Sequence, residues 1–207
     1  VKVCRMRDTP IIVFINKLDR EGKDGFDLLD EIEAKLGLTV LPMTWPVGMG
    51  QRFKGVYNIF EKELNLFMPH SKQDVPEEVI GITDLADKTL DEQIGEKMAD
   101  ELREDAEVLH EVYPKFSKEA YRKGEISPVF FGSAVNNFGV KELLDCFINI
   151  APDPLPRETE EREVAPTEPK FTGFVFKIHA NIDPRHRDRI AFMRICSGTF
   201  KRNTNYY

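Results

Sequence analysis

Two short apolar runs, each followed by a polar loop and then by a helical pattern, constrain the fold most strongly. The first is Thr9–Ile15 and the second is Ser127–Phe131. Such runs, rich in β-branched or aromatic residues, are typical of parallel strands buried on both faces. Two strand–loop–helix units predict an α/β fold with a parallel, doubly wound sheet, which binds its ligands at the carboxyl ends of the strands.

The helices of both units can be placed from their sequence patterns. Asp24 is a suitable N-cap and Gly37 a suitable stop for a helix with apolar residues at helical spacing, namely Phe26, Leu29, Ile32 and Leu36. After the second run, Val140–Ile150 shows a similar apolar stripe. We therefore expect one α/β domain over residues 1–150.

The segment between the two strand–loop–helix units has a different sequence pattern. Thr39–Phe67 contains short β-like runs broken by Pro and Gly, which predicts an irregular or antiparallel insertion rather than another βα unit. Asp91–Val112 has the pattern of one long amphipathic helix, and Phe116–Lys123 that of a short helix. These patterns predict an inserted α+β subdomain over about residues 40–125.

The C-terminal part is predicted to be a linker followed by a β-domain. Residues 151–169 include five prolines and many acidic residues, which is typical of an interdomain linker. Phe171–Ile178 and Arg189–Ile195 read as strands on either side of a basic, turn-rich stretch at 181–187. We expect residues 170–207 to be the first strands of this domain and the chain to be part of a longer protein.

Composition and charge narrow the class of protein. Of 207 residues, 41% are hydrophobic and 31% charged, and no apolar run is long enough to cross a bilayer, so we expect a soluble protein that needs no membrane. Three distant cysteines without metal spacing favour a reducing cytoplasm over a disulfide framework or a zinc site.

The net charge is −7, but residues 170–207 carry eight Lys and Arg against two Asp, which leaves −13 for residues 1–169. This asymmetry fits contact with RNA and fits a solvated basic face equally well.

The polar sequence Asn16-Lys17-Leu18-Asp19 directly follows the first apolar run and suits a guanine base. Guanine presents two donors on one edge, N1–H and the exocyclic amine, and the Asp19 carboxylate offers two acceptors in a matching fork. Adenine lacks this pair of donors, and hydrogen-bonding sites discriminate by roughly 10⁴ or more. Alone, such a four-residue motif is also a common turn composition, so its place after a buried strand is what favours nucleotide binding.

Four further residues complete the predicted base site. Asn16 suits the N7 side of the base and can tie neighbouring loops together, while Lys17 can lay its methylenes along the base. After the second run, Ser133 and Ala134 can place a backbone N–H toward guanine O6, and the Ser133 hydroxyl can brace Asp19. Both loops should meet at the same edge of the sheet.

Other motifs predict no chemistry. The four histidines, His70, His110, His179 and His186, lack metal spacing, and Gly48-Met49-Gly50 lacks the Lys and Ser/Thr of a phosphate loop. No residue is a convincing candidate for activating water, so we assign neither catalytic residues nor metal ligands to this chain.

With these motifs in place, the sequence resembles the translational GTPases. Asn16-Lys17-Leu18-Asp19 and Gly132-Ser133-Ala134 match the two guanine-specificity motifs of that superfamily, and Phe53-Lys54-Gly55-Val56 resembles elongation factor G. Closer still are the bacterial class II peptide chain release factors, through Thr44-Trp45-Pro46, Phe138-Gly139-Val140 and His186-Arg187-Asp188-Arg189.

The resemblance implies part of a P-loop-type GTPase domain, its inserted subdomain, and the start of a β-barrel second domain. It further implies GTP/GDP as ligand, with Mg²⁺ and the phosphate-binding and hydrolysing residues supplied by sequence outside this chain. Such factors use GTP to release class I release factors from the ribosome, so rRNA, ribosomal proteins and these factors are the implied partners of a monomeric protein. The alternatives are a translocase like elongation factor G, a ribosome-protection GTPase, or a non-hydrolysing ribosome-binding scaffold.

Overall fold

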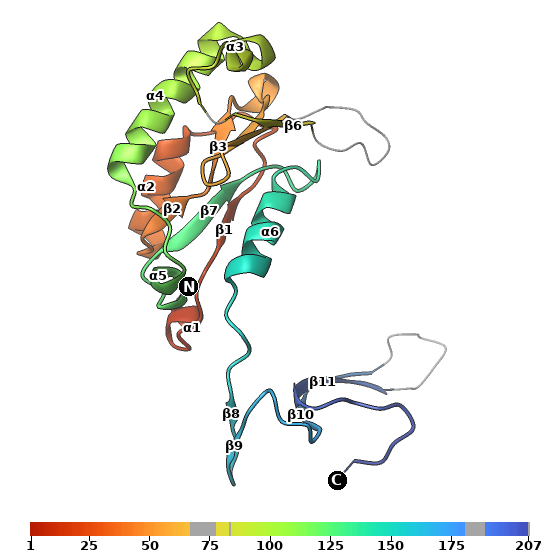
Figure 1. Ribbon diagram of the computed structural model, residues 1–207. Helices are drawn as coiled ribbons and strands as arrows, with labels where there is room; N and C mark the ends of the chain where they lie inside the picture. Colours follow the sequence, from red (N-terminus) through yellow and green to blue (C-terminus); the bar gives the residue numbers. More distant parts are fainter. Residues whose placement is uncertain (67–77, 83, 181–188, 207) are drawn as a thin grey trace. The chain divides into compact units, whose positions relative to one another are not determined.

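The computed structural model describes residues 1–66, 78–82, 84–180 and 189–206, which form two compact units, Val1–Ala151 and Pro152–Tyr207. A parallel sheet organises the first unit (Figure 1). Its strands are β1 (Val13–Ile15), β7 (Ser127–Phe131) and β2 (Val40–Pro42), in the order β1-β7-β2. The predicted α/β fold is confirmed, and residues far apart in the sequence meet in this sheet.

Helices cover both faces of the sheet. Helix α2 (Gly25–Leu36) begins at the Asp24 N-cap, whose carboxylate accepts from Phe26 N, and ends at Gly37 with φ 61°. Helix α6 (Val140–Ile150) has the bounds predicted from its pattern, and a short helix, α1 (Lys2–Arg5), opens the chain. The side chains of β7 alternate, because Val129 and Phe131 join the cluster on the α2 side while Phe130 joins the one on the α6 side.

Two expectations about the strands were wrong. β1 is an edge strand of the described sheet and its side chains are only half-buried, because it pairs with β7 on one side alone among the described residues. β2 pairs in parallel with β7 through Val40↔Ser127. Val40–Pro42 therefore belongs to the parallel sheet, and the antiparallel part begins at Thr44.

The antiparallel sheet follows in chain order. It consists of β3 (Thr44–Val47), β4 (Gly55–Asn58), β5 (Glu63–Leu66) and β6 (Glu78–Gly81), with a 3₁₀ turn, η1 (Gly50–Arg52), between the first two. Residues 67–77, between β5 and β6, lie outside the described residues.

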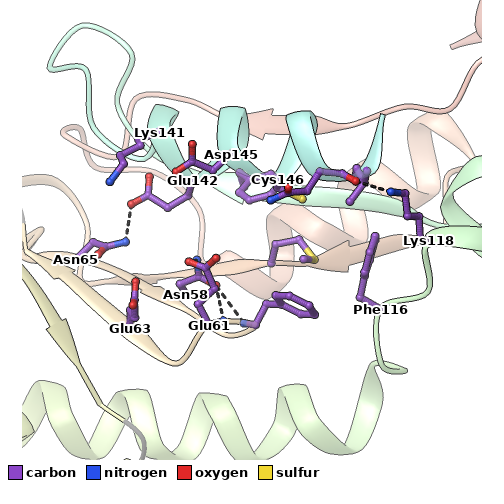
Figure 2. A pocket seen from close by; sticks show the side chains of 15 residues that line it. Asn58, Glu61, Glu63, Asn65, Phe116, Lys118, Lys141, Glu142, Asp145 and Cys146 are labelled. Carbon is purple, nitrogen blue, oxygen red and sulfur yellow. Dashed lines mark hydrogen bonds between the residues drawn. The ribbon is translucent and has the colours of Figure 1, made fainter. Parts of the chain in front are cut away.

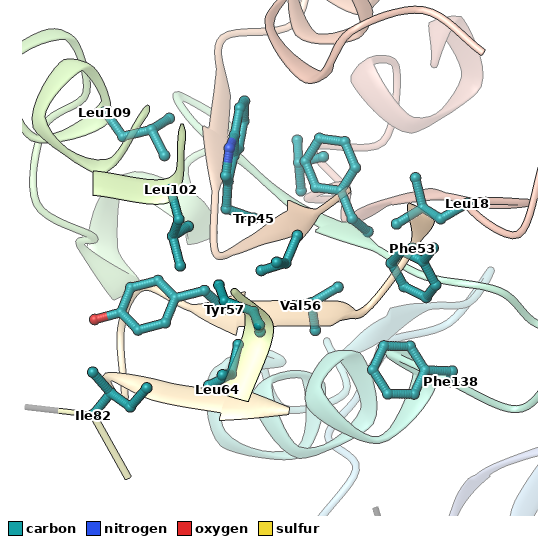
Figure 3. Packing of buried hydrophobic residues seen from close by; sticks show 14 of the residues in the cluster. Leu18, Trp45, Phe53, Val56, Tyr57, Leu64, Ile82, Leu102, Leu109 and Phe138 are labelled. Carbon is teal, nitrogen blue, oxygen red and sulfur yellow. The ribbon is translucent and has the colours of Figure 1, made fainter. Parts of the chain in front are cut away.

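Trp45 lies at the centre of the core of the first unit (Figure 3). It is 2% exposed, its ring is 4.5 Å from that of Phe26 and 5.4 Å from that of Phe131, and its Nε1 donates to Asp105 Oδ2 at 2.8 Å. A Cβ on Gly25 would lie 2.8 Å from Trp45 Cη2. Helix α2, the antiparallel sheet, β7 and the helix that carries Asp105 thus all pack on one indole ring.

The long helix expected at 91–112 is two helices, α3 (Lys88–Ile94) and α4 (Glu96–Val112). The break is at Gly95, whose φ of 88° and ψ of 145° do not continue a helix. Across the corner, Arg103 of α4 donates two hydrogen bonds of 2.9 and 2.8 Å to Asp91 and lowers the pKa of that carboxyl group. The short helix predicted near 116–123 is α5 (Lys118–Arg122), capped by Ser117.

The described residues of the second unit form two antiparallel pairs of strands. β10 (Thr172–Ala180) and β11 (Arg189–Ser197) pair antiparallel as predicted, whereas residues 181–188 lie outside the described part. Their apolar side chains are largely exposed. The linker is more ordered than expected, since β8 (Arg157–Glu158) pairs with β9 (Glu163–Val164) and Val164 is 4% exposed.

Among the helices of the described residues, none has the length and apolar character that crossing a membrane requires.

Candidate functional site

The loops after β1 and β7 meet at the carboxyl edge of the parallel sheet, as the sequence predicted. Ile15 is the register partner of Phe131, and the pairing continues beyond the strands. Gly132 N donates to Ile15 O at 3.0 Å, and Leu18 N donates to Gly132 O at 3.1 Å. Backbone hydrogen bonds therefore hold the two loops against each other.

Asn16 joins the two loops through its side chain. Its Oδ1 accepts from Lys17 N at 2.8 Å and from Ala134 N at 2.9 Å. Lys17 has a φ of 73°, a left-handed conformation that turns the chain sharply after the strand. Because Oδ1 is occupied by two amides, the remaining polar group of Asn16 is its Nδ2 donor.

Asp19 is oriented by residues of the other loop. Ser133 Oγ donates to Asp19 Oδ1 at 2.5 Å, and Asn136 Nδ2 donates to Ser133 Oγ at 2.8 Å. Ser133 is 1% exposed, whereas the Asp19 side chain remains 30% exposed. The Arg20 Nε lies 4.0 Å from Asp19 Oδ2, at the limit of an ion pair. The carboxylate is thus fixed in direction while it still has acceptor capacity toward solvent.

Ala134 is exposed, but its amide is in use. Because Ala134 N donates to Asn16 Oδ1, a guanine O6 at this position would have to share or replace that bond. Ser133 N donates to Phe138 O at 2.9 Å. Val135, the next residue, is 88% exposed and was not a sequence candidate. Its amide is a second donor that the loop offers to an incoming oxygen.

Sequence reasoning also missed the support beneath the first loop. Leu18 is 1% exposed, and its carbonyl accepts from Gly50 N at 2.9 Å. Phe53 stacks edge to face on Phe138 at 5.5 Å, so the η1 turn packs under both loops (Figure 3). Gly48-Met49-Gly50 is the turn that the sequence predicted, and the motif itself gave no signal that it contacts the loop after β1.

All five predicted site residues lie at this edge: Asn16, Lys17, Asp19, Ser133 and Ala134. Side-chain hydrogen bonds connect four of them, and Lys17 is exposed and bonds to Asn16 through its amide. The arrangement offers directed hydrogen-bond acceptors and donors. It is suited to recognising a planar ligand through hydrogen bonds.

Comparison with known proteins identifies the domains of this chain. Residues 1–153 match the model of the elongation factor Tu GTP binding domain, and residues 170–207 match elongation factor G domain 2. The fold is similar to a crystal structure of a Thermus thermophilus protein described as ttk003000868, with a TM-score of 0.60 and 23% sequence identity.

That alignment covers 95% of this chain and 29% of the Thermus protein, so the chain spans less than a third of the length of this relative. At this identity the likeness concerns the fold alone. The family match is broader, because the GTP binding domain model covers most of the chain. The chain therefore belongs to the translational GTPases, in which an elongation factor Tu GTP binding domain is followed by sequence of elongation factor G domain 2.

Proposed function

We propose that the edge formed by the loops after β1 and β7 reads the guanine base of GTP or GDP. The observation that carries the proposal is the bond from buried Ser133 to Asp19, which fixes one carboxylate oxygen and leaves the side chain partly exposed. A carboxylate held in this way can accept from guanine N1–H and from the exocyclic amine together.

The other residues take complementary parts. Asn16 uses Oδ1 to hold two amides, so its Nδ2 is the donor for guanine N7. Exposed Lys17 covers one face of the base with its methylenes. The Ala134 and Val135 amides are the donors for O6, and the small Ala134 side chain permits close approach.

Phosphate binding and hydrolysis are assigned to other parts of the full-length protein. The resemblance to translational GTPases places the Mg²⁺ ligands and the phosphate-binding loop outside this chain. In the glycine-rich turn Gly48-Met49-Gly50, the Gly50 amide donates to Leu18 O and is therefore not directed at a phosphate.

For the whole protein we propose a cytoplasmic translation termination factor that uses GTP binding and hydrolysis to dissociate class I release factors from the ribosome. Residues 1–150 form the GTPase part, with a subdomain inserted within about 40–125, 151–169 the linker, and 170–207 the start of a second domain. Supporting this over its relatives are Thr44-Trp45-Pro46 and the run His186–Arg189, of which residues 186–188 lie outside the described part.

Trp45 is buried in the core, and a core residue is explained by packing alone. It therefore supports the termination factor only through the resemblance of its sequence motif. The second candidate is a translocase like elongation factor G or a ribosome-protection GTPase, which the match of residues 170–207 favours. The basic charge of that segment suits a ribosomal RNA partner in either case.

Two assays on the full-length protein separate these proposals. GTP-dependent ejection of a class I release factor from post-termination ribosomes supports the termination factor, and translocation without ejection would replace it by the second candidate. Titration with fluorescent GDP and ADP tests the base site itself. Equal affinity for the two nucleotides would mean a scaffold that has lost guanine recognition.

A further inference from the structure

A cavity lies away from the loops after β1 and β7. It has a volume of about 350 Å³ and is enclosed by the antiparallel sheet on one side and by α6 on the other, with residues around the start of α5 at one end (Figure 2). None of the residues assigned to the base lines it. A ligand bound in this cavity would therefore not contact the residues proposed to bind the base.

The cavity combines an apolar floor with carboxylates. Met43, Phe130 and Ile150 form apolar surface, and Phe60 packs edge to face on Phe116 with ring centroids 6.1 Å apart. The carboxylates come from two elements that face each other, with Glu61 and Glu63 on the sheet side and Glu142 and Asp145 on α6.

Local hydrogen bonds hold part of this acidic lining in place. Asn58 Oδ1 accepts from the amides of Phe60 and Glu61 at 3.1 and 3.0 Å, and its Nδ2 donates to Glu61 Oε2 at 3.1 Å. The turn that begins at Asn58 therefore keeps Glu61 at the cavity.

Among the described residues, the two lysines of the lining, Lys118 and Lys141, form no ion pair with Glu61, Glu63 or Asp145. Lys118 Nζ donates to Asn149 O at 2.5 Å, so its ammonium is engaged by the C-terminal end of α6. Within the described ranges, no ion pair within 4.0 Å involves Glu61, Glu63 or Asp145. Without counting Glu142, the three carboxylates of Glu61, Glu63 and Asp145 still outnumber the two lysines of the lining.

A second observation is a buried side-chain amide oxygen, that of Asn65, for which the described residues provide no hydrogen-bond donor. Asn65 on β5 is 3% exposed and lines the cavity, and its Nδ2 donates to Glu142 Oε1 at 2.5 Å. Its Oδ1 is buried and has no hydrogen-bond partner among the residues that the structure describes. Buried acceptors are satisfied in most proteins, so an acceptor of this kind favours a donor brought by a ligand.

We propose that this cavity binds an organic cation, a guanidinium or ammonium group on a short aliphatic stem. The stem would lie on the apolar floor, and the head group would donate to the carboxylates of Glu63 and Asp145 and to Asn65 Oδ1. A guanidinium fits best because its five N–H groups form a planar fork, and it can also stack on the Phe60–Phe116 pair. Among the described residues no acidic cluster has the arrangement of a metal site, so an organic cation is preferred over a metal ion.

The test uses agmatine as the probe, with the full-length protein, calorimetry, and NMR of the Asn65 side-chain amide. We expect saturable binding that shifts the Asn65 resonances, while the neutral ureido analogue of the same length does not bind. Replacing two of the carboxylates, by Glu63→Gln with Asp145→Asn, should weaken binding about tenfold or more, because charge-assisted bonds are lost. Glu107→Gln, at an exposed position on α4 outside the cavity, is the matched control and should leave the affinity unchanged.

A capped arginine amide distinguishes the two sources of such a cation. Tighter binding of the capped arginine points to a side chain of a protein partner, and tighter binding of agmatine points to a free small molecule. Either result supports the site. Absence of saturable binding, equal binding of the ureido analogue, or equal weakening by Glu107→Gln would overturn the proposal, whether or not guanine recognition is confirmed.

Discussion

The sheet edge formed by the loops after β1 and β7 and the core around Trp45, called here the centre, each contain an aspartate that accepts a hydrogen bond from a residue distant in sequence. The surroundings of the two aspartates differ. At the edge, Ser133 bonds to Asp19, whose side chain stays 30% exposed. At the centre, Trp45 Nε1 bonds to Asp105, and burial raises the pKa of that carboxyl group. Substitutions at the centre should therefore change stability, and substitutions at the edge should change ligand choice.

Truncating the indole should have the largest effect on stability. Trp45→Ala removes a ring that α2, β3, β7 and α4 share, and a loss of about 3–5 kcal/mol in the free energy of unfolding is expected for a buried aromatic residue. Chemical denaturation measures it. A loss below about 1 kcal/mol would mean that Trp45 is not the centre of the core.

Gly25→Ala tests the close contact between α2 and Trp45. The new Cβ would lie 2.8 Å from Trp45 Cη2, and such overpacking typically lowers the free energy of unfolding by about 1–3 kcal/mol. Gly22→Ala is the matched control, because its Cβ would meet only Met49 Sδ at 3.4 Å. Thermal melts that fall equally for both variants would contradict this explanation.

Ser133→Ala tests the brace at the edge. Loss of the bond to Asp19 should weaken GDP binding by about tenfold, in line with the loss of one charge-assisted hydrogen bond. The midpoint of unfolding should change much less than in the Trp45 variant. Unchanged GDP affinity in fluorescence titration would show that Asp19 needs no brace.

Asp105→Asn should have the smallest effect on the free energy of unfolding, and this effect should change with pH. Burial, and secondarily nearby Asp24, Glu101 and Glu104, raises the pKa of Asp105 above its ordinary 3.8, against the opposing bond from Trp45. A carboxyl group with a raised pKa stabilises the folded state below its ordinary pKa, and this contribution is lost as the pH rises through the raised value.

Asparagine does not titrate, so the variant should lose less stability than the natural chain as the pH rises from just below 3.8. Denaturation midpoints of both proteins across this range measure the difference. A difference that stays constant with pH would show that Asp105 does not titrate within it.

Local patterns were sufficient to predict much of the fold. The Asp24 cap, the Gly37 stop and the apolar stripe of Val140–Ile150 gave α2 and α6, because capping and helical spacing are local properties. Non-local pairing was harder. Val40–Pro42 pairs with β7 although a long stretch of chain lies between them, and its short run shows no parallel signature.

The sequence was sufficient to predict that the two loops meet at one edge of the sheet, but not every hydrogen bond that holds them there. Asn16, Asp19 and Ser133 were predicted to lie close together because they follow two strands of one parallel sheet, and their hydrogen bonds do join the two loops. The roles of Gly50 and Asn136 could not be predicted. The amide of Gly50 donates to Leu18 O, which is distant in sequence, and Asn136 donates to Ser133 through a loop conformation that no local pattern indicates.

The central claim, that Asp19 reads the base, is tested most directly by Asp19→Asn in the full-length protein, with Asp30→Asn on α2 as an exposed control. Asn offers one donor and one acceptor, which match xanthine, whose C2 substituent is an oxygen. Competition titrations with GDP and XDP should show the preference moving toward XDP in Asp19→Asn alone. An unchanged ratio of GDP to XDP affinity would contradict the account.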